Sequence, residues 1–174
     1  MSRHIGYLFI APAFIILFFT SIYPVAFSFY FSFFDWNWGN QENFIGLDNY
    51  LFLLTDPEFW TVIYNTFVFA SVSCFLEVTL GIILAIFVDR IVFCSTVIRT
   101  ILILPLMVSG IIVSMISKIM FNNLFGVIPY GLKQIDIRSS FFGSTEAAMP
   151  TLIGVDVWWQ TSFVFIIILA ALQG

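Results

Sequence analysis

The most constraining feature of the sequence is a run of 30 residues, positions 5–34, that contains no Asp, Glu, Lys or Arg. A helix of about 20 apolar residues crosses a bilayer core of about 30 Å, so this run is long enough to span it. The composition of the 174-residue chain agrees, with 61% apolar and only 9% charged residues. Because soluble domains carry about 25% charged residues, the sequence predicts a membrane protein.

Three further stretches are apolar enough to cross a membrane. Before the second span, Asp56 and Pro57 indicate an N-cap followed by the first helical residue. In the third span, Pro105 predicts a kink, which a membrane bundle tolerates. The predicted fold class is all-α, a polytopic membrane helix bundle with four spans, at about 7–30, 60–88, 99–120 and 152–172.

The basic residues orient these spans. Arg3 precedes the first span, and Arg90 and Arg99 lie between the second and the third. Segment 35–58 carries five acidic residues and no Lys or Arg. Because Lys and Arg favour cytoplasmic loops, we predict that both chain ends are cytoplasmic and that segment 35–58 lies outside.

Segment 35–58 has an apolar pattern of its own. Apolar residues recur there at helical spacing. This pattern predicts a short helix lying in the outer membrane interface, with its apolar face formed by Leu47, Tyr50, Leu51 and Leu54.

Glu77 is the ionisable residue that lies deepest within a predicted span. Thirteen residues, about 20 Å of helix, separate it from Arg90. A charged carboxylate facing lipid at that depth is costly, so we expect Glu77 to face the bundle interior. Two interpretations stay open: it lines a solute pathway or proton relay, or it forms a hydrogen bond to Ser, Thr or Asn on a neighbouring helix.

Two further residues are candidates for a solute path. Trp158 and Trp159 fit an interfacial aromatic belt, and stacking on a carbohydrate is the alternative interpretation. We therefore count Trp159 and the adjacent Gln160 with Glu77 as solute-path candidates.

No pattern of a catalytic, cofactor-binding or metal site occurs in the sequence. His4 is the sole histidine, there is no Cys and His cluster, and no glycine loop suited to phosphate is present. Six Lys and Arg residues make no basic surface for nucleic acid. We predict that the chain is not an enzyme, holds no cofactor of its own and binds no nucleic acid.

Several strings together resemble one family. They are FIGLDNYLFLLTDPEFW (44–60), GIILAIFVDR (81–90), RTILILPLMVSGIIVSMI (99–116), FNNLFGVI (121–128) and DVWWQTSFVFIIILAALQG (156–174). In order and spacing they resemble the front half of the sugar-type ABC importer permeases, the MalF/UgpA-like branch of the binding-protein-dependent permeases with the MetI-like fold. Residues 1–174 would then form the N-terminal part of one permease transmembrane domain.

The resemblance implies a membrane subunit that translocates a sugar or related small polar solute across the cytoplasmic membrane. It also implies a set of partners: a second permease subunit, a cytoplasmic ABC ATPase dimer that binds the ATP, an extracytoplasmic solute-binding protein and membrane lipid. The N-terminus of the family is cytoplasmic, in agreement with the charges.

The resemblance also implies that the chain is truncated. In the family, the segment matching AALQG leads into a cytoplasmic loop with the EAA coupling motif, and two more helices follow. Glu146-Ala147-Ala148 is not that motif, because Leu152 stands where the motif has glycine. We expect the chain to stop before the coupling loop, and the alternatives are a self-standing four-helix scaffold or small channel, or a non-functional permease fragment.

Overall fold

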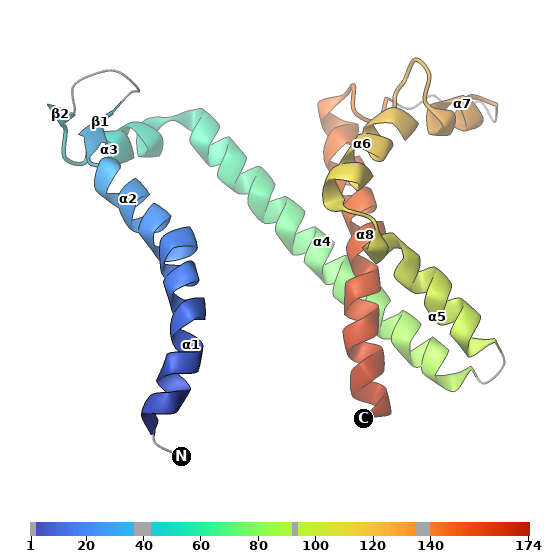
Figure 1. The fold of residues 1–174 in the computed structure, drawn as a ribbon. Helices are drawn as coiled ribbons and strands as arrows, with labels where there is room; N and C mark the ends of the chain where they lie inside the picture. Colours follow the sequence, from blue (N-terminus) through green and yellow to red (C-terminus); the bar gives the residue numbers. More distant parts are fainter. Residues whose placement is uncertain (1–2, 37–42, 92–93, 135–139) are drawn as a thin grey trace. The chain divides into compact units, whose positions relative to one another are not determined.

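The computed structural model describes residues 3–36, 43–91, 94–134 and 140–174. They divide into two compact units, residues 1–63 and residues 64–174. Helices make up most of both units (Figure 1). Among the described residues, three helices are long and apolar enough to cross a membrane, and a bent helix pair adds a fourth, broken span.

The first unit begins with one continuous helical segment, formed by α1 (Arg3–Leu17), the π-helical turn η1 (Phe18–Ile22) and α2 (Tyr23–Phe31). Pro24, at the start of α2, cannot donate a helical hydrogen bond. The turn before it is widened, so that the Tyr23 N–H reaches the Phe18 carbonyl, five residues back. None of the apolar window in this segment is buried within the described structure, as suits a helix facing lipid or another subunit.

A small hairpin and a short helix follow α2. Asn49 donates hydrogen bonds to the carbonyls of Ser32 and Phe34, at 2.9 and 3.1 Å. The Tyr50 hydroxyl lies 2.6 Å from the Ser32 hydroxyl. These bonds fix the short helix against the end of α2 and confirm that a helix forms there. The elements are β1 (Phe34–Asp35), its antiparallel partner β2 (Asn43–Phe44) and α3 (Asp48–Thr55).

Helix α4 (Pro57–Arg90) begins where the sequence predicts. The Asp56 carboxylate accepts a hydrogen bond from the Glu58 N–H at 2.9 Å. Pro57 occupies the first helical position, where its missing N–H costs nothing. The predicted cap is confirmed, and the helix then runs without interruption over 34 residues.

The second unit is built around the long C-terminal helix α8. Phe165 is completely buried and packs with Ala85, Val88 and Leu169 in an apolar core. Neighbours from α5 and α8 cover this core. The elements that follow α4 are α5 (Ser95–Ile103), the 3-10 turn η2 (Leu104–Met107), α6 (Gly110–Met120), α7 (Val127–Lys133) and α8 (Thr145–Gln173).

The third predicted span is broken instead of kinked. Pro105 lies in η2, as the proline rule anticipates. The break follows at Val108 and Ser109, and the two helical parts are bent by 91°. The sequence therefore predicted a disturbance here but not its size.

Helix α8 begins well before residue 152, the predicted start of the fourth span. The Ser144 hydroxyl caps it by accepting the Ala147 N–H at 3.3 Å. At its other end, Gln173 accepts from Arg99 and donates to Asp89, each at 3.3 Å. The end of α4, the start of α5 and the end of α8 therefore meet at one end of this unit.

Candidate functional site

Helices α4 and α8 approach each other closely at a small residue. A Cβ added to Gly81 would lie 2.6 Å from Val164 Cγ1 and 3.2 Å from the Phe165 nitrogen. Gly81 is buried, and so is Ala85 one turn later. Small residues four apart allow this approach in membrane helices.

Glu77 lies one turn before Gly81 on α4. Its carboxyl group lies near the carboxyl group of Asp156 on α8, and both residues are half-buried. A hydrogen bond between two carboxyl groups needs one proton between them. Glu77 thus contacts a neighbouring helix, although its partner is an acid and not the Ser, Thr or Asn that the sequence suggested.

Sequence reasoning missed Asp156, which it treated as part of the approach to the fourth span. Gln160 lies one helical turn after it, so the two share a face of α8. Gln160 is half-buried, and no hydrogen bond of its amide is seen within the described residues. We call Glu77, Asp156 and Gln160 the polar patch. The i, i+4 spacing of Asp156 and Gln160 was the signal that could have found it.

Hydroxyl groups add to the polar character between these helices. Ser73, Thr161 and Ser162 are buried. The hydroxyls of Ser73 and Thr161 have no hydrogen-bond partner in the described part of the chain. Thr161 and Ser162 line a cavity of about 280 Å³ together with residues of α4, α5 and η2.

Trp159 contacts the third span at its break. Its indole N–H donates to the Val108 carbonyl at 3.1 Å. A Cβ added to Gly110, the first residue of α6, would lie 2.8 Å from the Cη2 atom of the same ring. The structure thus places Glu77 near Asp156 and bonds Trp159 to Val108, so the predicted site residues belong to two separate groups.

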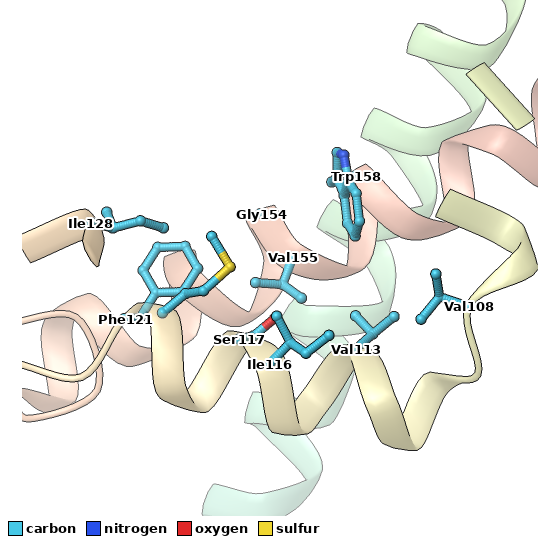
Figure 2. A pocket seen from close by; sticks show the side chains of 10 residues that line it. Val108, Val113, Ile116, Ser117, Phe121, Ile128, Gly154, Val155 and Trp158 are labelled. Atoms are coloured by element: carbon cyan, nitrogen blue, oxygen red, sulfur yellow. The ribbon is translucent and has the colours of Figure 1, made fainter. Parts of the chain in front are cut away.

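A second cavity, of about 300 Å³, lies between α6 and α8. Side chains of α6 face those of α8 across it (Figure 2). Its lining is almost entirely apolar and includes Val113, Ile116 and Ser117 of α6 with Gly154, Val155 and Trp158 of α8.

Known proteins are similar in sequence to almost the whole chain. No protein-family profile matches the chain. The trehalose/maltose transport system permease protein MalF of Thermococcus litoralis is 30% identical over 171 residues, which cover 97% of this chain and 58% of the relative. The alpha-glucoside transport system permease protein AglF of Rhizobium meliloti is 29% identical, over 97% of this chain and 51% of its own. The chain spans about half to three-fifths of the length of such relatives.

Solved structures show the same fold. A crystal structure of a bacterial ABC transporter involved in the import of the acidic polysaccharide alginate contains a chain that matches with a TM-score of 0.82. The match covers 98% of this chain and 58% of that one, at 24% identity. A crystal structure of a bacterial alginate ABC transporter in complex with an alginate pentasaccharide-bound periplasmic protein matches with a TM-score of 0.81. At this identity the likeness concerns the fold, and it confirms an all-α membrane bundle.

These homologues are transporter permeases and not enzymes. Together with the apolar helices, they identify a multi-pass inner membrane protein. Sequence and fold agree: the chain is similar to the sugar-type ABC transporter permeases, and it matches about half to three-fifths of their length.

Proposed function

We propose that this chain forms part of the membrane-spanning permease subunit of an ABC importer. The importer would translocate a sugar or related small polar solute across the cytoplasmic membrane. The observation that carries the proposal is the similarity to sugar permeases along 97% of the chain, supported by a fold match over 98% of it.

Such an importer needs further subunits. We propose a second permease, a cytoplasmic ATPase dimer that binds ATP, and an extracytoplasmic solute-binding protein. The alginate transporter supports the last of these, because it was crystallised with a periplasmic protein. We place residues 1–174 in the N-terminal part of one permease domain, with the N-terminus in the cytoplasm. The basic residues Arg3, Arg90 and Arg99 support this orientation.

We place the solute path beside the polar patch. Polar side chains inside a membrane are costly and mark solute pathways. Sugars are bound through hydrogen bonds to carboxylate and amide groups, and Glu77, Asp156 and Gln160 supply both. Trp159 precedes Gln160 on α8, and its N–H is bonded to Val108.

Solute uptake by cells that carry the complete importer tests the proposal. The probes are radiolabelled trehalose, maltose, an alpha-glucoside and an alginate oligosaccharide, each added with and without depletion of cellular ATP. We expect ATP-dependent uptake of at least one. Gln160→Ala should lower its uptake about tenfold, which corresponds to one lost hydrogen bond of about 1.4 kcal/mol.

Val78→Ala is the matched control, because Val78 is 41% exposed on α4 and stands next to Glu77. Uptake by this variant should equal that of the unchanged importer. ATP-independent leakage of every probe would contradict the proposal and favour a small channel. Normal uptake in Gln160→Ala and Asp156→Asn would instead remove the solute path from the polar patch.

The proposed orientation has its own test. Native Cys94 lies just before α5 and is exposed. In intact cells, a membrane-impermeant maleimide should modify a cysteine placed at Leu51 in α3 but should not reach Cys94. The reverse labelling pattern would overturn the orientation.

A further inference from the structure

The third span consists of two helical parts joined by a short pivot. The bend between segments Ser95–Met107 and Gly110–Met120 is 91°. Val108 and Ser109 connect them in extended conformations, with φ, ψ of −90°, 131° and −61°, 140°. A change in the dihedral angles of these two residues alone would therefore redirect α6.

The two sides of this pivot are packed differently. On one side, α5 and η2 both contact α8, and Leu102 and Ile103 of α5 cover the core around Phe165. On the other side, the cavity of about 300 Å³ separates α6 from α8 (Figure 2). The α6 side therefore has room to move, whereas α5, which also borders a cavity of about 280 Å³, is held by its packing over the core around Phe165.

The break leaves the Val108 carbonyl outside the helical hydrogen-bond pattern. Within a membrane, such a group needs a partner from the protein. The indole N–H of Trp159, which is 51 positions further along the chain, donates a hydrogen bond to this carbonyl at 3.1 Å. The pivot is thus held by one side chain of α8.

A second contact fixes the same ring. Gly110 begins α6, and a Cβ there would lie 2.8 Å from Trp159 Cη2. Only a residue without a side chain allows this approach. The neighbouring Trp158 differs, because its side chain is 57% exposed and lines the cavity.

We propose that Trp159 is a positioning residue for transport: it latches the pivot at Val108–Ser109 through its indole N–H, and release of this latch lets α6 change direction relative to α5 and α8. The role of Trp159 in transport rests on the proposed function, whereas the latch rests on the structure alone.

Distance measurements between α5 and α6 test the latch without transport. Spin labels are placed at Val97→Cys and Ile119→Cys, positions that are 58% and 59% exposed. Native Cys74 and Cys94 are first replaced by alanine, and the chain is embedded in lipid nanodiscs. We expect one narrow distance distribution, which Trp159→Phe broadens or shifts because Phe keeps a ring but cannot donate a hydrogen bond.

Trp158→Phe is the matched control and should leave the distribution unchanged. An unchanged distribution in Trp159→Phe would overturn the latch. Gly110→Ala provides a second variant, since its methyl group should displace the indole and broaden the distribution. In the Trp159→Phe background the added methyl should have little further effect, because the smaller ring leaves space, and full additivity of the two substitutions would contradict the shared contact.

Uptake kinetics separate the latch from a solute contact. A positioning role predicts that Trp159→Phe lowers the maximal uptake rate several-fold while the KM for solute stays within about twofold. A raised KM with an unchanged maximal rate would assign Trp159 to solute binding and overturn the latch. If the unchanged importer takes up no solute while the distances respond as expected, the proposed function fails and the latch stands.

Discussion

The two halves of α8 are packed in contrasting ways. In the C-terminal half, Phe165 and Leu169 are 0% and 7% exposed and contact α4 across a close helix approach. In the N-terminal half, Trp158 is 57% exposed and faces a cavity toward α6. Along its C-terminal half α8 therefore packs closely against α4, whereas along its N-terminal half it borders a cavity toward α6.

The largest effect is expected in the close-packed half. Phe165→Ala should lower the free energy of unfolding by about 3–5 kcal/mol, because it leaves a large cavity in the apolar core. Thermal unfolding in detergent measures the change. Phe163→Ala is the control, since Phe163 is 52% exposed on the same helix. Equal losses from the two substitutions would contradict the assigned packing.

The close approach of α4 to α8 gives the next largest effect. Gly81→Ala forces a methyl group against Val164 and should cost about 1–3 kcal/mol through overpacking. Gly154→Ala, in the other half of α8, is the control, because an added Cβ there meets nothing within 4 Å. If Gly154→Ala proves as damaging as Gly81→Ala in the same unfolding assay, the contrast between the halves is wrong.

Glu77 of α4 lies near Asp156 of α8, and we predict that a hydrogen bond between their carboxyl groups links the two helices. Glu77→Ala should cost about 1 kcal/mol, the usual worth of a hydrogen bond between membrane helices. Glu77→Gln should keep most of that stability, because its amide can donate to the Asp156 carboxylate. Detergent-melting curves of the two variants measure the difference. A Gln variant as unstable as the Ala variant would show that the bond is not formed.

The smallest effect is expected in the cavity. Val155→Ile adds one methylene group there and should stabilise the chain by at most about 0.8 kcal/mol. Because it fills space that α6 would use, it should slow uptake more than its effect on stability suggests. Faster uptake combined with higher stability would argue against movement of α6 into this space.

Some features of this structure could be predicted from residues that lie close together in the sequence. Asp56 and Pro57 specify the start of α4 because a cap and its helix are adjacent in the chain. Gly81 and Ala85 lie four residues apart, and this spacing of small residues is a local signal of close helix packing. Four apolar stretches were enough to predict an all-α membrane bundle.

Contacts between distant residues could not be predicted in the same way. Pro105 predicted a kink, but the 91° bend also involves Val108. The Val108 carbonyl accepts its hydrogen bond from Trp159 on another helix. Glu77 was recognised as unusual, yet its partner Asp156 depends on how α4 and α8 cross. A single sequence gives residue types and spacing, whereas these contacts depend on which helix faces lie together.

The most direct test compares mobility on the two sides of α8 after Trp159→Phe has removed the latch. One pair of spin labels joins Val97 of α5 to Leu172 of α8, and the other joins Ile119 of α6 to Leu152 of α8, all at exposed positions. In the Trp159→Phe variant, electron–electron distance distributions in nanodiscs should be narrow for the first pair and clearly broader for the second. Two equally narrow distributions would contradict the account of a fixed half and a movable half.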